Sequence, residues 1–310
     1  MVELRKKYKR GVAKMLYNNL SGYFREKYGR RLSKICIDGG FSCPNRDGKI
    51  SHGGCIYCGE RGAGEHIDAT LSIREQVINR LKDADKDEMF VAYFQNFTNT
   101  YAPVDVLKRR YDAALIDERI KVLAIGTRPD CIDEEIASLI ASYKDKVDVW
   151  VELGLQTASD KTADIVNRGY HRDSFESAMS ILKKHSIPVV VHLIIGLPGE
   201  EMQDIKETVE YINGFDLFGI KIHSIYVMTG TELENMYLRG EYIPPSMDYY
   251  TDMAVYIITH IKSDIIVHRL TGDCPRDMLV APDWNGQKNK IIQTIVDKMA
   301  QNGLSQGSLA

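Results

Sequence analysis

Short apolar segments alternate with amphipathic segments along the chain from about residue 33 to residue 227. The apolar segments are rich in Val, Ile and Leu and have turn-forming residues at their ends, which is typical of buried strands. The amphipathic segments repeat apolar positions every three to four residues, as helices do. We expect strands at residues 33–38, 90–94, 122–125, 147–155, 189–195 and 220–227. We expect helices at residues 73–81, 104–115, 133–142, 160–166, 174–185 and 201–212.

This order of elements predicts an α/β fold built from parallel βα units. Crossovers between parallel strands are right-handed, and the strands are buried on both faces. In a barrel of this kind the chemistry lies in loops at the carboxyl ends of the strands. The distinctive motifs of the chain lie at these positions: YFQNFTNTY at 93–101, GTRPD at 126–130, VELGLQ at 151–156 and GLPGE at 196–200.

The alternation ends near residue 240. IPPSM at 243–247 interrupts it, a helix is expected at 249–260, and a second helix is expected at 290–300 after the segment HRLTGDCPRDMLVAPDW. The chain is therefore divided into a basic N-terminal arm (1–32), a core barrel (33–240) and a C-terminal extension (241–310) that caps the barrel.

Composition indicates a globular protein without a membrane span. The chain has 310 residues, of which 44% are hydrophobic. Its apolar runs are far shorter than the roughly 20 residues that cross a bilayer, and the basic N-terminus has no apolar signal core. Six cysteines in a chain of this length do not form a disulfide framework and fit a reducing compartment. A cytoplasmic location is expected.

The first 34 residues are strongly basic, although the whole chain has a net charge of −3. They hold eleven Lys and Arg against two Glu, with five Tyr and Phe interleaved. Cations for phosphates and rings for base stacking are typical of a nucleic-acid footprint. An amphipathic helix that covers one end of the barrel has the same pattern, so both interpretations stay open.

Three cysteines gather in one polar, glycine-bearing loop, CPNRDGKISHGGCIYC, at residues 43–58. This density favours a soft metal or a cluster over core packing. A structural zinc site needs a fourth protein ligand, whereas an iron-sulfur cluster held by three cysteines leaves one iron open. His52 or His66 would complete a Cys3His zinc site, and the chain would then be a zinc-stabilised nucleic-acid-binding module.

The loop and the later motifs together resemble the radical S-adenosylmethionine (SAM) superfamily. CPNRDG, GGCIYC, TRPD, VELGLQ, NRGY, GLPGE, GIKIH and HRLTGDCPRD occur in the expected order between residues 17 and 284. The sequence is most similar to the YhcC/YtqA-like group, which is related to the radical SAM domain of the elongator catalytic subunit. Eleven residues separate Cys43 from Cys55, where the superfamily most often has three; the longer spacing suits this group.

The resemblance implies a radical SAM enzyme on a partial (βα)6 TIM-like barrel. It implies that Cys43, Cys55 and Cys58 ligate a [4Fe-4S] cluster, with the methionine part of SAM on the open iron. Reductive cleavage of SAM then yields a 5'-deoxyadenosyl radical that abstracts a substrate hydrogen, while the protein positions the reactants. Tyr57, between two of the cysteines, flanks the adenine or packs against the barrel rim.

Further SAM contacts are expected along the predicted loops and strands. Gln95, Asn96 and Phe97 replace the superfamily's glycine-rich turn, so their backbone carbonyls are candidates for the SAM ammonium. Glu152 and Gln156 share one strand face, and buried polar groups need partners. We favour ribose or methionine contacts for them over a structural network.

Four other positions complete the predicted cofactor site. Arg168 in NRGY is a candidate for the SAM carboxylate, and Arg128 in TRPD for cofactor or substrate. Gly196 allows backbone to approach a ligand closely, in a region that borders adenine in the superfamily. His223 either faces the pocket or is a satisfied core histidine.

Cysteines outside the loop lack metal-binding spacing. Cys36 lies on an apolar strand and is expected in the core. Cys131 and Cys274 lie in motif loops near the predicted mouth and, with Asp273, are the candidate catalytic residues.

The resemblance to the elongator subunit implies a tRNA substrate, specifically the wobble uridine. The chain lacks an acetyltransferase domain, so the complete carboxymethylation scheme of that subunit is not expected. The resemblance to the YhcC/YtqA-like group implies instead the conversion of a carboxymethylaminomethyl to an aminomethyl side chain. The alternative is radical chemistry on a small metabolite or peptide. The electron donor is expected to be a flavodoxin or a ferredoxin.

Overall fold

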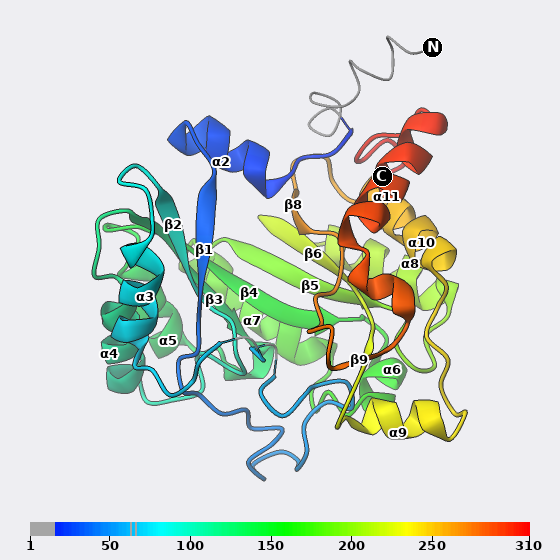
Figure 1. Cartoon of the computed structure of the whole chain (residues 1–310), viewed down its shortest axis with the longest axis horizontal. Coiled ribbons are helices and arrows are strands. Elements are labelled where there is room, and N and C mark those ends of the chain that lie inside the picture. The colour runs from blue at the N-terminus through cyan, green and yellow to red at the C-terminus, as the bar shows by residue number, and fades with distance from the viewer. Residues whose placement is uncertain (1–15, 63, 66) are drawn as a thin grey trace.

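A computed structural model of the chain describes residues 16–62, 64–65 and 67–310. Its main feature is a curved sheet of seven parallel strands in the order β1-β2-β3-β4-β5-β6-β8 (Figure 1). The strands are β1 (Leu32–Ile37), β2 (Met89–Phe94), β3 (Ile120–Thr127), β4 (Asp148–Gln156), β5 (Val189–Ile195), β6 (Gly219–Ser224) and β8 (Ile266–Arg269). The expected α/β partial barrel is confirmed, with the six predicted strands in sequence order and a seventh at one edge.

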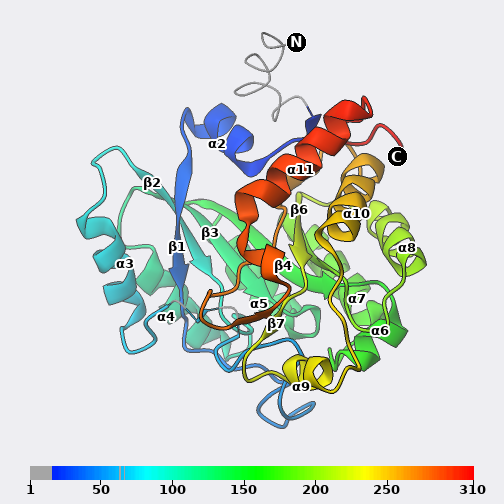
Figure 2. The same cartoon turned by 45° about the vertical axis from the view of Figure 1, so that its right-hand side comes forward.

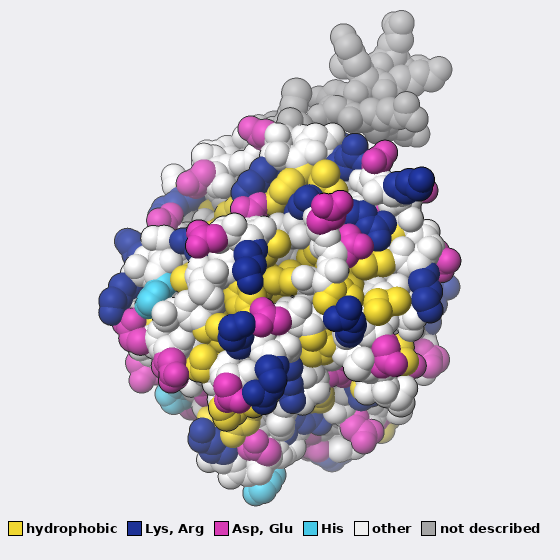
Figure 3. Space-filling view, turned by 90° about the vertical axis from the view of Figure 1, so that its left-hand side faces the viewer, with side chains coloured by type: hydrophobic (Ala, Val, Ile, Leu, Met, Phe, Trp, Pro, Cys, Tyr) yellow, Lys and Arg dark blue, Asp and Glu magenta, His cyan; other side chains and the backbone are white. Residues whose placement is uncertain are grey.

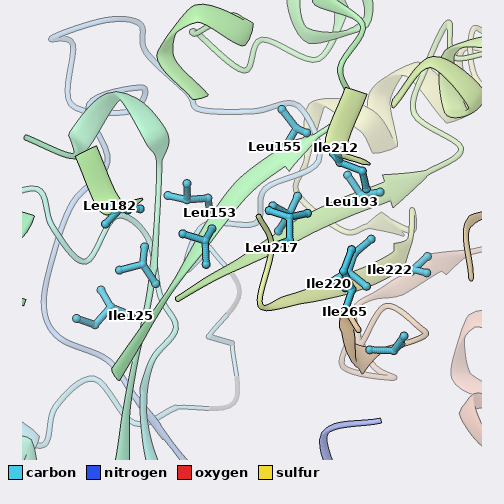
Figure 4. Packing of buried hydrophobic residues seen from close by; sticks show 14 of the residues in the cluster. Ile125, Leu153, Leu155, Leu182, Leu193, Ile212, Leu217, Ile220, Ile222 and Ile265 are labelled. Carbon is cyan, nitrogen blue, oxygen red and sulfur yellow. The ribbon is translucent and has the colours of Figure 1, made fainter. Parts of the chain in front are cut away.

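Helices cover the convex face of this sheet (Figure 2). They are α3 (Ile73–Lys82), α4 (Val104–Ala114), α5 (Glu134–Ala141), α6 (Asp160–Ile165), α7 (Arg172–Lys184), α8 (Met202–Asn213) and α10 (Met247–His260), and α11 (Lys288–Gln301) packs against α10. Local capping sets several of their starts; the Asp133 carboxylate, for example, accepts a 2.8 Å hydrogen bond from the Ile136 backbone at the start of α5. Leu and Ile side chains fill the layer between sheet and helices (Figure 4). This layer is the main core, as apolar strands buried on both faces predict.

The concave face is closed at the amino-terminal ends of the strands by α2 (Leu20–Tyr28). Leu20 and Phe24 are buried against inward-facing side chains that include Val91 and Trp150. The Phe24 and Trp150 rings stack with centroids 6.3 Å apart. In the described part of the basic arm, the structure therefore supports the interpretation as a helix that covers one end of the barrel.

The aromatic residues of α2 serve packing. Tyr23 meets Phe218 edge to face at 5.3 Å, and the Tyr28 hydroxyl donates to Asp148. These rings are not displayed as a stacking platform for bases. The arm's first 15 residues lie outside the described residues, so their predicted nucleic-acid contacts stay a prediction.

The C-terminal extension contributes to the sheet as well as capping it. Its strand β8 pairs in parallel with β6, a seventh strand that sequence analysis missed. Four residues are too few to show a clear apolar pattern, which is the reason for the miss. The sixth strand is also shorter than predicted: β6 ends at Ser224, and β7 (Val227–Met228) instead pairs antiparallel with β9 (Leu279–Ala281). The boundary predicted at residue 240 stays a prediction.

Candidate active site

A cavity of about 240 Å³ opens at the carboxyl ends of the strands, and all seven strands of the main sheet contribute to its lining. Side chains alternate along each strand, so the inward positions form successive layers. On β4, inward Trp150 lies in the apolar cluster under α2, and Glu152, Gly154 and Gln156 above it line the cavity. The cavity therefore has an apolar base, a polar floor and a mouth beneath the cysteine loop.

Ten of the thirteen predicted cofactor and metal residues line this cavity. They are Cys43, Cys55, Cys58, Tyr57, Gln95, Phe97, Arg128, Glu152, Gln156 and His223. Asn96, Arg168 and Gly196 do not line it. The roles assigned to all thirteen stay predictions, but the fold brings most of them to one place.

The cysteine loop follows β1 and is held by hydrogen bonds to its own backbone. The Cys58 backbone N–H donates to the Cys55 carbonyl at 2.9 Å, which closes the turn between the paired cysteines. Side-chain donors also approach the sulfurs: Asn45 Nδ2 lies 3.8 Å from Cys55 Sγ, and Arg128 Nη1 lies 4.0 Å from Cys43 Sγ. Thiolates in this loop would therefore meet positive charge and N–H donors.

The paired thiols interact directly. The hydrogen bond with Cys58 lowers the pKa of Cys55 to about 6, and the same bond raises the pKa of Cys58 well above its usual value. Gly53 and Gly54, directly before Cys55, have φ values of 86° and 81°. Side chains rarely adopt this backbone conformation, so the glycines let the loop turn toward the cavity.

The loop after β2 places Gln95 and Phe97 on the cavity and turns Asn96 away. The Asn96 amide is buried and donates a 2.8 Å hydrogen bond to Asp38 Oδ2. Phe97 has a φ of 58°, unusual for a residue with a side chain, and its ring lies beneath the Arg46 guanidinium at 5.6 Å. The left-handed backbone at Phe97 turns this loop toward the cavity, which suits the predicted contact of its backbone carbonyls with SAM.

Arg168 holds a turn instead of lining the cavity. Its guanidinium is buried and donates to the carbonyls of Leu155, Thr157 and Tyr170. The predicted contact with the SAM carboxylate finds no support in this placement. Of the two arginines predicted in the site, Arg128 reaches the cavity, where Asp130 accepts two hydrogen bonds from it, at 2.9 and 2.8 Å.

Gly196 also lies outside the cavity lining. Its φ is 91°, its carbonyl accepts a 2.6 Å hydrogen bond from the Tyr242 hydroxyl, and its N–H donates to Glu200 at 2.7 Å. Burial raises the pKa of Glu200 to about 8. Gly196 allows the backbone to turn after β5, and its predicted approach to adenine stays a prediction.

Glu152 is the centre of a buried polar network. Its carboxylate accepts hydrogen bonds from Lys221, from His192 at 2.8 Å and from the Trp150 indole at 3.1 Å. The Lys221 ammonium holds the pKa of Glu152 well below its usual value against the effect of burial. The network that sequence analysis considered the less favoured alternative is therefore present, on a residue that also lines the cavity.

Gln156 ends β4 in a left-handed conformation, with a φ of 61°. Its side chain lies 3.1 Å from the Tyr170 hydroxyl, which also donates to the Gly154 carbonyl. His223 lines the cavity, and burial lowers its pKa well below the usual value. The structure thus answers the question left open for His223 in favour of the pocket.

Sequence analysis missed much of the polar floor. Lys34, Tyr93, His192, Lys221 and Arg269 all line the cavity. The signal in the sequence that could have identified most of them is a charged residue or a histidine within an otherwise apolar strand.

The prediction for Cys36 was wrong: its side chain was expected in the core, but it lines the cavity.

The three candidate catalytic residues do not line the cavity. Cys131 lines a separate surface pocket with Lys49 and Tyr101, and burial raises its pKa to about 12. Asp273 is 60% exposed in its side chain and pairs with Arg269 at 3.3 Å. For Cys274, burial likewise raises the pKa to about 12. The catalytic roles of these three residues stay predictions.

Comparison with known families gives this site its context. Residues 47–212 match the Radical SAM superfamily model, and residues 218–301 match the Radical_SAM C-terminal domain model. The chain therefore belongs to the radical SAM superfamily, and it is an enzyme of that class.

Within the superfamily, the chain is similar to the protein YtqA of Bacillus subtilis, with 35% identity over 94% of this chain and 92% of YtqA. It is also 31% identical to a tRNA uridine(34) acetyltransferase of Methanocaldococcus jannaschii, over 61% of this chain and 34% of that protein. The resemblance stated from the motifs is confirmed.

A solved structure supports the fold. Elp3 of Methanocaldococcus infernus with an N-terminal deletion superposes with a TM-score of 0.66 at 19% identity, over 89% of this chain and 64% of that one. At this identity the likeness concerns the fold.

The residues present fit the cluster that the superfamily normally binds. Three thiols line one cavity beside Arg128 and Asn45, which suits an anionic sulfur cluster. In a four-iron cluster each thiolate binds a different iron, so the thiols need not converge on one point. Among the described residues, no three His, Cys, Asp or Glu side chains are grouped to hold a single ion. The zinc alternative with His52 stays a prediction, and His66 lies outside the described residues.

Proposed function

We propose that this enzyme shortens a carboxymethylaminomethyl side chain of the tRNA wobble uridine to an aminomethyl side chain. The observation that carries the proposal is the 31% identity to a tRNA uridine(34) acetyltransferase over 61% of this chain. Similarity over this length makes a shared uridine substrate the simplest inference. Removal of the carboxymethyl group would begin with loss of a hydrogen atom from the carbon beside nitrogen, a step suited to radical chemistry. Return of one electron from that carbon to the cluster, followed by addition of water, would break the C–N bond, release glyoxylate and leave the aminomethyl group, with SAM consumed as the oxidant.

Cys43, Cys55 and Cys58 would hold the [4Fe-4S] cluster, and SAM would occupy the cavity beside it. When bound, these cofactors supply a carbon-centred radical that removes a hydrogen atom from the substrate. Arg128, 4.0 Å from Cys43 Sγ, places positive charge beside the thiols. Tyr57 and Gln156 line the same cavity and would orient the bound groups.

The proposed setting is the cytoplasm, with a flavodoxin or ferredoxin as the electron donor. No helix in residues 16–62, 64–65 and 67–310 is long and apolar enough to cross a membrane. Six free cysteines suit a reducing compartment.

The experiment is nucleoside analysis of bulk tRNA from a deletion strain. Carboxymethylaminomethyl uridine should accumulate, and the aminomethyl form and its derivatives should fall. Wild-type enzyme should restore the profile, whereas a Cys55→Ser variant should not. Glu210→Gln is the control, because Glu210 is exposed on α8 and does not line the cavity. An unchanged wobble-uridine profile in the deletion strain would reject the proposed reaction.

One observation favours a second candidate, radical chemistry on a small metabolite or peptide. The described basic helix α2 closes the end of the barrel opposite the cavity mouth, and its rings are packed inward. Figure 3 shows Lys and Arg side chains interspersed with Asp and Glu on one face of the molecule, which gives that face no continuous positive field. Tight, salt-dependent binding of bulk tRNA would favour the tRNA substrate, and weak, salt-insensitive binding the second candidate.

A further inference from the structure

The floor of the cavity carries excess positive charge. Lys34 on β1, Lys221 on β6 and Arg269 on β8 line it, and Glu152 is the one acidic side chain among the described lining residues. Glu152 is bonded to Lys221, so that pair is neutral. Arg269 is partly compensated by Asp273, which lies outside the lining and is well exposed. Positive charge therefore remains around Lys34.

Lys34 has no hydrogen-bond acceptor for its ammonium within the described part of the chain. The ammonium lies over the Tyr93 ring, 5.4 Å from its centroid. Lys221 lies over the same ring at 4.3 Å and donates to its hydroxyl at 3.1 Å. Two cations thus contact one aromatic ring. Burial lowers the pKa of both lysines, that of Lys221 to about 7, which reflects the cost of burying positive charge here.

A second group on the same cavity lacks a partner. His223 Nε2 is buried without a hydrogen bond among the described atoms, while its ring lies 5.2 Å from that of His192. A buried polar atom without a partner is costly, and it marks a position where a ligand atom fits. An unpaired ammonium and an unpaired imidazole nitrogen together suit an anionic ligand that carries oxygen atoms.

We propose that this floor binds the carboxylate of the substrate, with Lys34 as its ion-pair partner and Arg269 as the second cation. The inference rests on the proposed function, in which the substrate side chain ends in a carboxylate and the product has lost it. The product's aminomethyl group is positively charged, so the same cations that hold the substrate repel the product. The floor therefore provides both recognition and a reason for product release.

The carboxylate of SAM is the other source of this chemistry. Lys34 and Cys36 occupy successive inward positions of β1, and Cys43 follows in the loop beyond the strand. Lys34 therefore lies deeper in the barrel than the thiols. SAM is expected at the open iron beside the thiols, which leaves the floor to the substrate.

The test uses two anticodon stem-loop RNAs that differ only at the wobble uridine, one carrying the carboxymethylaminomethyl group and the other the aminomethyl group. Their affinities are measured for the full-length, cluster-reconstituted enzyme at fixed ionic strength by fluorescence anisotropy. Wild-type enzyme should bind the first RNA about tenfold or more tightly than the second, the size of one charge-assisted hydrogen bond. Lys34→Met should abolish this preference, and Lys34→Arg should retain part of it.

Lys290→Met is the matched control, because Lys290 is exposed on α11. It should keep the wild-type preference, and SAM affinity by equilibrium dialysis should be unchanged in Lys34→Met. If that variant does not fold, Arg269→Gln tests the same preference. The proposal would be overturned if Lys34→Met keeps the preference for the first RNA, or if Lys34→Met loses affinity for SAM and not the preference between the RNAs.

The outcomes separate this inference from the proposed function. No preference in the wild-type enzyme overturns the inference, even if the deletion strain shows the expected tRNA change. A clear preference that depends on Lys34, with an unchanged tRNA profile in the deletion strain, rejects the proposed reaction and supports the carboxylate site.

Discussion

Removal of the Glu152 charge should destabilise the fold strongly. Glu152 and Lys221 are about 1% and 2% exposed, and their ion pair lies between the apolar layer under α2 and the cavity. Glu152→Gln leaves the Lys221 ammonium buried without its counter-charge. Breaking a buried pair in this way costs about 3–5 kcal/mol. For a chain of this length, with an unfolding entropy of roughly 2.1 cal/mol/K per residue, this loss corresponds to a Tm lower by about 5–8 °C.

The assay is urea unfolding of the cluster-free protein, followed by circular dichroism and Trp fluorescence so that coincident transitions can be verified. Glu210→Gln, at an exposed position of α8, is the matched control and should lie within about 0.5 kcal/mol of wild type. The double variant Glu152→Gln/Lys221→Met should recover much of the loss, because it removes both charges. The reasoning is refuted if Glu152→Gln unfolds at the same urea concentration as the Glu210 control.

Two further predictions concern α2 and the turn after β5. Phe24→Ala should lower the free energy of unfolding in urea by about 3–5 kcal/mol, because the ring is 3% exposed and its removal leaves a cavity. Leu309→Ala, at a side chain that is 53% exposed, should lower it little. Equal losses in the two variants would contradict the capping role of α2. Glu200 has a pKa raised to about 8 by burial, so its stabilising contribution is complete below about pH 4.5 and is lost as the pH rises through 8. Glu200→Gln should therefore gain stability relative to wild type between pH 5 and 9, and parallel pH profiles would contradict this.

The strands and helices of the barrel were largely predictable, because local apolar periodicity determines them. The strand predicted at 189–195 is β5 (Val189–Ile195) without change, and most helix ends agree within two residues. The exceptions depend on contacts distant in sequence. β8 forms a strand because it pairs with the edge of β6. The predicted sixth strand ends early because β7 pairs with β9 and does not continue β6.

The sequence by itself determined the class of protein and the cysteine loop, since motif order and thiol spacing are properties of the chain. Only the tertiary structure decided what faces the cavity. Lys34 follows the basic arm in the sequence, but β1 directs it into the cavity. The Arg168 guanidinium donates to three backbone carbonyls and lies outside the cavity lining. The physical reason is that the direction of a side chain depends on strand register and on partners tens of residues away, and these are set when the sheet assembles.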